Sequence, residues 1–238
     1  MKLFDLCVFT IGIIIGSFLN VCIFRIPRGE DIVYQRSCCP YCGRTLMWYE
    51  LIPVASFVIQ KGKCRGCGRK LSWQYPLIEL ANGCAYLLLV HVVGISPVSI
   101  LYGLCVSALL VLAVIDFRTY EIPLGCNLFI GILGLIRLFL DLPNWKDYAA
   151  GFFAVSGIFV ALYFLTKGKG IGGGDIKLMA AAGLLLGFEK ILFALAVGSG
   201  AALGIHAALM IRKKKEHMFA FGPYLAAGIF CSLMISCI

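Results

Sequence analysis

Charged residues are scarce in this chain: Asp, Glu, Lys and Arg make up 14% of its 238 residues, whereas hydrophobic residues make up 61%. A soluble domain of this length needs far less apolar surface than that. Alternating segments of about ten residues, which would indicate a transmembrane β-barrel, are also missing. The composition therefore argues against a soluble protein and indicates a chain that spans a membrane through α-helices.

Histidine is almost absent, since only His91, His206 and His217 occur, and no His-Glu-x-x-His motif is present. The chain therefore lacks the usual ligand pattern of a zinc metalloprotease. Gly198-Ser199-Gly200 faintly resembles the turn of an intramembrane serine protease, but His206 follows on the same helix, about 10 Å away by helical rise. Packing of small residues is the better interpretation of that stretch.

Long apolar runs, by contrast, recur along most of the sequence. They cover approximately 3–24, 77–95, 98–115, 124–140, 148–166, 177–188, 191–211 and 218–237. Runs of roughly 18 to 22 apolar residues are long enough to span a bilayer as helices, and the short run 177–188 would be tilted or partly re-entrant. The run 3–24 lacks a basic n-region and a cleavage site, so we expect an uncleaved first span. The sequence predicts an all-α polytopic membrane protein with about eight transmembrane helices.

The distribution of basic residues predicts which loops face the cytoplasm. If the N-terminus lies outside, the inner segments are 25–76, 116–123, 167–177 and 212–217, and they contain 17 of the 21 Lys and Arg residues. Cytoplasmic loops carry such an excess of positive charge. The same bias accounts for the net charge of +9 without nucleic-acid binding, for which no known reading motif is present. We expect both termini outside the cytoplasm.

The polar segment 25–76 is too small to hold itself together through a core, and it contains paired cysteines. Cys39-x-x-Cys42 and Cys64-x-x-Cys67 are each followed by glycine, a pattern typical of a tetrahedral zinc site with four thiolate ligands. Four protein ligands leave no open position, so such a zinc ion would be structural. Two disulfides are the alternative, but a loop in the reducing cytoplasm favours the metal. Cys38 is a spare neighbour and an alternative ligand.

Two aspartates stand where apolar runs meet polar loops: Asp116, before Phe-Arg-Thr-Tyr-Glu-Ile-Pro, and Asp175, after Gly-Ile-Gly-Gly-Gly. A carboxylate at such a boundary is costly and is a candidate functional residue. Two carboxylates that approach each other can share one proton, so that one acts as acid and the other as base, as in aspartic proteases. The glycines at 172–174 would allow a close approach of the backbone. The alternative is that both aspartates only cap helix N-termini.

Taken together, these motifs resemble those of the bacterial type IV prepilin peptidases, GxGD-type aspartic proteases that are also N-methyltransferases. The resemblance runs from end to end. Its motifs are Gly16-Ser-Phe-Leu-Asn20, the four cysteines, Tyr75-Pro76-x-x-Glu79, Asp116 with Ile122-Pro123, Gly172-x-Gly174-Asp175-x-Lys177, and Phe221-Gly222-Pro223-Tyr224. Leu124 departs from the aspartate that many members carry after Ile-Pro, at a position outside the catalytic pair.

The resemblance implies a membrane-bound aspartic endopeptidase of the bacterial inner membrane. It would cleave the basic leader of prepilins or pseudopilins after a glycine, on the cytoplasmic side, with Asp116 and Asp175 as catalytic residues and Gly172, Gly174 and Lys177 in support. The new N-terminal residue would then be methylated with S-adenosylmethionine. No residue of the sequence identifies the binding site of that cofactor.

The apolar runs, the polar segment and the motifs together divide the chain into three parts. These are a first transmembrane helix (1–24), a cytoplasmic tetracysteine zinc loop (25–76) and a transmembrane peptidase core (77–238).

Two non-peptidase interpretations remain. A small transporter with a zinc-stapled loop would carry polar residues deep within several spans, whereas these aspartates sit at one face. A non-enzymatic assembly factor of a secretion system would not need either aspartate.

Overall fold

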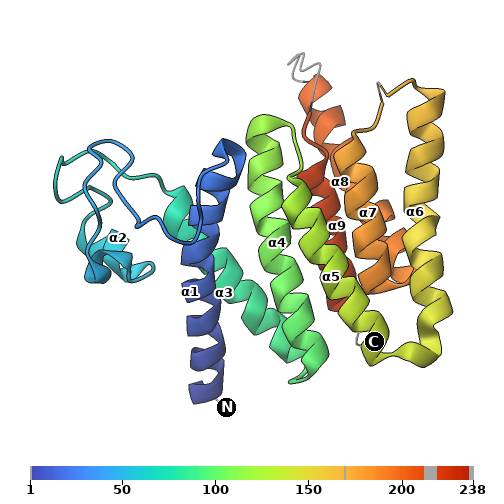
Figure 1. The fold of residues 1–238 in the computed structure, drawn as a ribbon, viewed down its shortest axis with the longest axis horizontal. Coiled ribbons are helices and arrows are strands. Elements are labelled where there is room, and N and C mark those ends of the chain that lie inside the picture. The colour runs from blue at the N-terminus through green and yellow to red at the C-terminus, as the bar shows by residue number, and fades with distance from the viewer. Residues whose placement is uncertain (1, 169, 212–218, 236–238) are drawn as a thin grey trace. The chain divides into compact units, whose positions relative to one another are not determined.

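The computed structural model describes residues 2–168, 170–211 and 219–235, and these ranges form helices without any β-strand (Figure 1). The helices are α1 (Lys2–Arg25), η1 (Ile26–Arg28), η2 (Trp48–Leu51), α2 (Ala55–Ile59), α3 (Gln74–Val93), α4 (Pro97–Thr119), α5 (Leu124–Leu140), η3 (Leu142–Asn144), α6 (Trp145–Leu165), α7 (Gly173–Leu186), α8 (Phe188–Ile211) and α9 (Gly222–Ile235). The expectation of an all-α protein is confirmed.

Each of the eight apolar runs coincides with one long helix of the structure. Within the described ranges, five helices are long and apolar enough to cross a membrane, namely α1, α3, α4, α6 and α8. Helices α5 and α9 are apolar but shorter, with 17 and 14 residues, and α7 also has 14. The protein is therefore a helical membrane protein, and the count of eight spans remains a prediction. The basic inner segment 212–217 lies outside the described residues.

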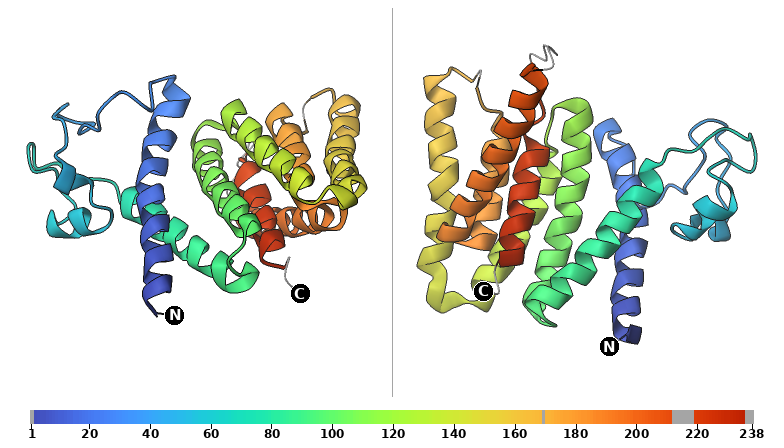
Figure 2. Two further views of the ribbon diagram at one scale, coloured as in Figure 1. Left: turned by 60° about the horizontal axis from the view of Figure 1, so that its bottom comes forward. Right: turned by 180° about the vertical axis from the view of Figure 1, so that it is seen from behind.

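The chain divides into two compact units, Met1–His91 and Val92–Ile238. In the first unit, glycines allow α1 and α3 to pack backbone against backbone (Figure 2). A Cβ atom at Gly12 would lie 2.7 Å from the Cα of Gly83, and one at Gly16 would lie 2.7 Å from the Cα of Glu79. The Asn82 amide crosses the same contact and donates to the Gly12 carbonyl at 2.7 Å. Small residues and polar hydrogen bonds hold membrane helices together in this way.

Arg25, the last residue of α1, anchors the polar loop that follows. Its buried guanidinium donates to the carbonyl oxygens of Asp31 and Gln35, both at 2.9 Å, and of Arg36 at 3.2 Å. A buried charge is tolerated only when hydrogen bonds compensate for its lost hydration. The first part of the loop is therefore folded back onto the end of the helix.

In the second unit, helices α4 to α9 form a bundle (Figure 1). Helix α7 packs against both α5 and α6, while α9 packs against α4 and α8. Gly151 of α6 faces Gly183 of α7 so closely that a Cβ atom on either glycine would overlap the backbone of the other helix. This packing brings the end of α4 near the beginning of α9, which is where Asp116 lies.

Candidate functional site

Asp116 lies in the last turn of α4 and is 5% exposed. Its Oδ2 atom accepts a hydrogen bond from the backbone N–H of Gly222, with 2.8 Å between the heavy atoms. Gly222 begins α9, and the first N–H groups of a helix have no partner within it. Helix α4 ends at this point because Tyr120 adopts a left-handed conformation (φ 57°) and donates its N–H to the Asp116 carbonyl. Asp116 is thus fixed through both its main chain and its side chain.

Asp175 lies in the first turn of α7, which begins at Gly173 rather than at the apolar run that starts at residue 177. Its carboxylate is hydrogen-bonded to the backbone of Gly172, the N-cap residue, and it interacts electrostatically with the charge of Asp116. Asp116 and Asp175, at the ends of two different helices, therefore lie close enough for their charges to interact. Both carboxylates also accept N–H groups at helix beginnings, so the capping interpretation describes part of what they do.

The glycines beside Asp175 serve close packing at two positions. A Cβ atom at Gly174 would lie 3.0 Å from the Cβ of Ile122, and one at Gly172 would lie 3.1 Å from Oδ2 of Asp175. At Gly173, by contrast, a Cβ atom would meet nothing within 4 Å. Gly174 thus lets the loop before α5 approach the beginning of α7, and Gly172 leaves room for the Asp175 carboxylate. The packing gives no reason for Gly173.

Asn127, in the first turn of α5, is a site residue that none of the sequence motifs includes. It is 4% exposed, and its Nδ2 donates to the carbonyl oxygen of Gly174 at 3.3 Å. Only the amide nitrogen can donate to a carbonyl, so this contact fixes the orientation of the side chain. Its Oδ1 is buried and has no hydrogen-bond partner within the described ranges. In the sequence, Asn127 stands out only as a single amide in an apolar run shortly after Pro123. Lys177, which belongs to the Asp175 motif, is exposed.

The four cysteines of the predicted metal site converge, although they come from two separate stretches of the loop. The Sγ atoms of Cys39, Cys42, Cys64 and Cys67 all lie within 4.8 Å of one another. None of the four forms a disulfide, so the pairing considered as an alternative is not present. A cluster of four thiols at this separation fits the donor set of a tetrahedral zinc site. Cys38 is exposed and does not belong to the cluster.

Both halves of the cysteine cluster have the same local geometry. The N–H of Gly43 donates to the Cys39 carbonyl at 3.0 Å, and the N–H of Gly68 donates to the Cys64 carbonyl at 2.9 Å. Each of these glycines has a φ of +69°, a conformation that is costly for other residues. The glycine after each cysteine pair therefore closes a tight turn that directs two thiols to the same side.

The backbone of the second turn also activates one of the thiols. Hydrogen bonds from the backbone N–H groups of Cys67 and Gly66, together with neighbouring thiols, lower the pKa of Cys64 to about 6. The thiolate is the form that binds metal ions. The local fold thus favours the ligand form of Cys64.

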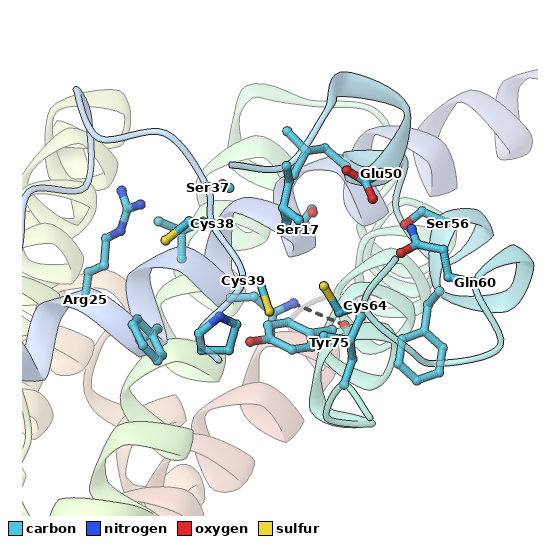
Figure 3. A pocket seen from close by; sticks show the side chains of 18 of the residues that line it. Ser17, Arg25, Ser37, Cys38, Cys39, Glu50, Ser56, Gln60, Cys64 and Tyr75 are labelled. Carbon is cyan, nitrogen blue, oxygen red and sulfur yellow. Dashed lines mark hydrogen bonds between the residues drawn. The ribbon is translucent and has the colours of Figure 1, made fainter. Parts of the chain in front are cut away.

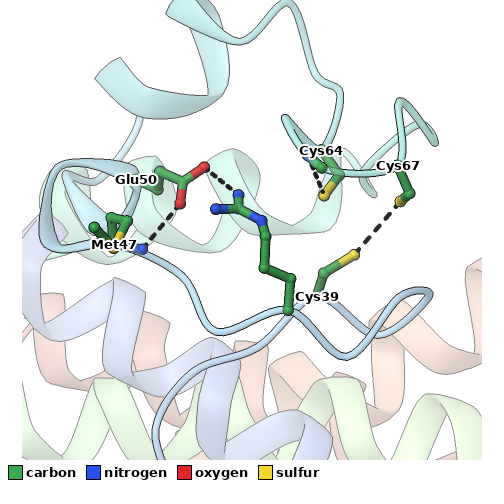
Figure 4. A network of polar contacts seen from close by, with 7 residues as sticks. Cys39, Met47, Glu50, Cys64 and Cys67 are labelled. Atoms are coloured by element: carbon green, nitrogen blue, oxygen red, sulfur yellow. Dashed lines mark hydrogen bonds and ion pairs between the residues drawn. The ribbon is translucent and has the colours of Figure 1, made fainter.

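An ion pair braces the loop beside the cysteine cluster. The Arg44 guanidinium donates to Oε1 of Glu50 at 2.6 Å, and the Met47 N–H donates to Oε2 of the same carboxylate at 2.9 Å (Figure 4). The guanidinium and this N–H hold the pKa of Glu50 below its usual range. Since Arg44 directly follows the first cysteine turn, the pair connects that turn to η2.

Comparisons with known proteins match the chain along most of its length. The family model described as Bacterial Peptidase A24 N-terminal domain matches residues 10–93, and the model of the Type IV leader peptidase family matches residues 103–208. A prepilin leader peptidase/N-methyltransferase from Bacillus subtilis (strain 168) is 38% identical over 224 residues, which cover 92% of this chain and 90% of the relative. A protein of the same name from Neisseria gonorrhoeae is 34% identical over 92% of this chain and 86% of the relative. No solved structure matches the chain.

Proposed function

Because the chain belongs to the prepilin leader peptidase/N-methyltransferase family, we propose that it removes the basic leader from type IV prepilins or pseudopilins by aspartic catalysis. Cleavage takes place after a glycine at the cytoplasmic face of the bacterial inner membrane, and the new N-terminal residue is methylated. The observation that supports the catalytic part is that Asp116, at the end of α4, and Asp175, at the beginning of α7, lie close enough for their charges to interact. The two helices are far apart in the sequence, so this proximity comes from the fold.

Aspartic catalysis would give each carboxyl group of the pair a different task. One ionised carboxylate takes a proton from a water molecule, whose oxygen attacks the carbonyl carbon of the scissile peptide bond. The other carboxyl group, protonated, donates to the carbonyl oxygen, and the departing amine takes up a proton as the bond breaks. Two like charges at short range favour a single shared proton, which supplies one acid and one base.

The membrane location supports the same proposal. A prepilin carries its own apolar helix, so its leader is presented near the surface of the bilayer, and both aspartates lie at helix ends. The charge bias of the loops assigns this surface to the cytoplasm and both chain termini to the other side. We assign zinc to the four cysteines as a structural ion, because four thiolates complete a tetrahedral coordination sphere.

Substitution of either aspartate tests the catalytic proposal. Asp116→Asn and Asp175→Asn should each abolish leader cleavage by purified protein in detergent, because an amide cannot share the proton. Glu121→Gln is the matched control, since it removes an exposed carboxylate from the loop after Asp116. Size-exclusion chromatography verifies that each variant is folded. Efficient cleavage by either asparagine variant would disprove the assignment.

A fusion series tests the orientation in the membrane. A reporter that is active only outside the cytoplasm should be active when fused near Asn144 and inactive near Gly66, because these positions belong to loops of opposite predicted location. The reverse pattern would place the aspartates on the wrong side for a cytoplasmic leader.

A further inference from the structure

The first unit contains a cavity of about 420 Å³ that the proposed peptidase chemistry does not use. It lies between the end of α1, the beginning of α3 and the cysteine loop (Figure 3). Sites for small molecules usually have volumes of roughly 300 to 1,000 Å³. The cavity is therefore large enough for a small organic ligand and is confined to residues 17–79.

Three sequence motifs of the first unit meet in this cavity. Ser17 comes from the Gly16–Asn20 motif of α1, Tyr75 from the motif at the beginning of α3, and Cys39 and Cys64 from the metal cluster (Figure 3). Glu79, from the same motif as Tyr75, also lines the cavity. The glycine contact between α1 and α3 brings the first two motifs together, since Gly16 touches the backbone at Glu79. A single binding site would account for all three motifs.

Glu79 contributes a buried carboxylate to the wall of the cavity. Its side chain is 7% exposed, and its carboxylate is hydrogen-bonded to the Val54 N–H at 2.7 Å and to the Ser17 side chain. Within the described ranges no ion pair includes Glu79. A buried carboxylate without a cationic partner is costly, and a positively charged ligand would offset that cost.

The other charged side chains of the lining that are buried already have partners. Arg25 donates to three backbone carbonyls, and Glu50 is paired with Arg44. Asn20, also buried, donates to the Tyr75 carbonyl at 3.1 Å. Glu79 is thus the buried group of the lining that is left to attract a cation.

The rest of the lining suits a flat ring. Phe24, Phe57 and Tyr75 each contribute to the wall, and aromatic side chains bind heteroaromatic rings by stacking. Ser37, Ser56 and Gln60 add polar groups along the same wall, and these can hydrogen-bond to a sugar or an amino acid. The wall therefore combines a buried negative charge, aromatic surface and neutral polar groups.

We propose that this cavity binds S-adenosylmethionine, with Glu79 offsetting the positive charge of the ligand. The proposal rests on the methyl transfer in the proposed function, for which the sequence offered no cofactor-binding residue. The bound cofactor would supply a methyl group that passes to the N-terminal amine, while the sulfur keeps the electron pair of the broken bond and a base accepts the proton released by the amine. Glu79 and Ser17 would hold the ligand, and the aromatic residues would offer a stacking surface to its adenine.

Two analogues allow the role of Glu79 to be measured without turnover. Sinefungin carries a protonated amine in place of the sulfonium, whereas S-adenosylhomocysteine has a neutral sulfur. Calorimetric titration of the purified, zinc-loaded protein should show binding of both. Glu79→Gln keeps an acceptor for the Val54 N–H but removes the charge. It should weaken sinefungin at least about tenfold and S-adenosylhomocysteine less than about threefold, as expected for the loss of a charge-assisted contact.

Two further variants separate ligand binding from folding. Ser56→Phe fills part of the cavity and should strongly weaken the binding of both analogues. Glu189→Gln removes an exposed carboxylate at the beginning of α8 and should weaken neither. Zinc content and chromatographic behaviour, measured for every variant, show which proteins are folded.

Three results would overturn the proposal: wild-type protein that binds neither analogue, equal weakening of both analogues by Glu79→Gln, or displacement of sinefungin by a synthetic basic leader peptide. The last result would assign the cavity to the substrate leader. The titrations need no prepilin, so they are independent of the catalytic proposal. The wild-type protein could fail to cleave a prepilin while Glu79→Gln still weakens the binding of sinefungin more than that of S-adenosylhomocysteine. That outcome would refute the peptidase function and leave the cavity assignment intact.

Discussion

Gly222 donates its backbone N–H to the carboxylate of Asp116, and the space beside it admits no side chain. A Cβ atom at Gly222 would lie 2.7 Å from Oδ2 and 3.0 Å from Cγ of the aspartate. Both the hydrogen bond and the missing side chain are therefore needed to hold Asp116 where it is, which makes Gly222 a positioning residue for the proposed catalytic pair.

The first prediction follows from this contact. Gly222→Ala should reduce leader cleavage at least about tenfold, because a small misplacement of a catalytic group can cost up to about a hundredfold in rate. Gly157→Ala in α6 is the matched control, since a Cβ atom there meets nothing within 4 Å. Cleavage of a prepilin by the two purified variants is the measurement. Equal activity of both variants would show that Asp116 does not depend on Gly222.

A second prediction concerns Asn127, which ties α5 to the residue before Asp175. Asn127→Ala removes the hydrogen bond from α5 to the Gly174 carbonyl, so cleavage should fall several-fold. Asn144→Ala, an exposed asparagine between α5 and α6, serves as control. Separate values of kcat and KM should show the loss in kcat if Asn127 positions Asp175. A loss confined to KM would contradict this role.

The third prediction addresses the cysteine cluster. Purified protein should contain about one zinc ion per chain, and the double variant Cys39→Ser, Cys64→Ser should lose it. Both cysteines line the cavity of the first unit, whereas both aspartates belong to the second unit. Methylation should therefore fall further than leader cleavage.

Metal analysis and mass spectrometry of the processed prepilin measure the two effects on the cysteine variant. The control double variant Cys7→Ser, Cys84→Ser changes two exposed cysteines and should retain zinc. Intact methylation combined with lost cleavage would instead assign the loop to the proteolytic step.

The fourth prediction is a pH dependence of stability. The Tyr148 hydroxyl donates to Asp141 at 2.7 Å, and Asn144 and Arg137 add further contacts to the same carboxylate. These contacts, with that of Tyr148 the strongest, hold the pKa of Asp141 below its usual value. The resulting stabilisation is complete above the unfolded-state pKa of about 3.9 and is lost as the pH falls through the lower folded-state value.

Thermal unfolding in detergent, followed by circular dichroism, should therefore show a decrease in Tm as the pH falls from about 5 towards 2. Asp141→Asn should be less stable than the wild type at neutral pH and should lose part of this decrease. The control Glu189→Gln should show the same decrease in Tm as the wild type. An unchanged pH profile in Asp141→Asn would mean that other carboxylates account for the acid sensitivity.

The sequence was most informative where local pattern determines structure. The apolar runs predicted the position of every long helix, because a lipid-facing helix must be apolar along its length. The two Cys-x-x-Cys pairs between Cys39 and Cys67 predicted the four-cysteine cluster, because zinc ligands follow a typical spacing. Helices α7 and α9 show the limit, since with 14 residues each they leave the number of spans unsettled. The contact between Asp116 and Gly222, which are 106 residues apart, depends on tertiary packing that periodicity does not encode. The same holds for Asn127 and for the unpaired charge of Glu79.

The glycine contact between α1 and α3 has a consequence for chain cleavage. Gly12 and Gly16 bring α1 directly against the backbone of α3. The polar loop begins at the end of α1 and ends at the beginning of α3, so it connects two helices that pack against each other. A protease cut near Tyr34, which is 89% exposed, would break the covalent link but not the helix contact. The two fragments should remain associated in the bilayer, so this protein could be reassembled from two separately synthesised polypeptides.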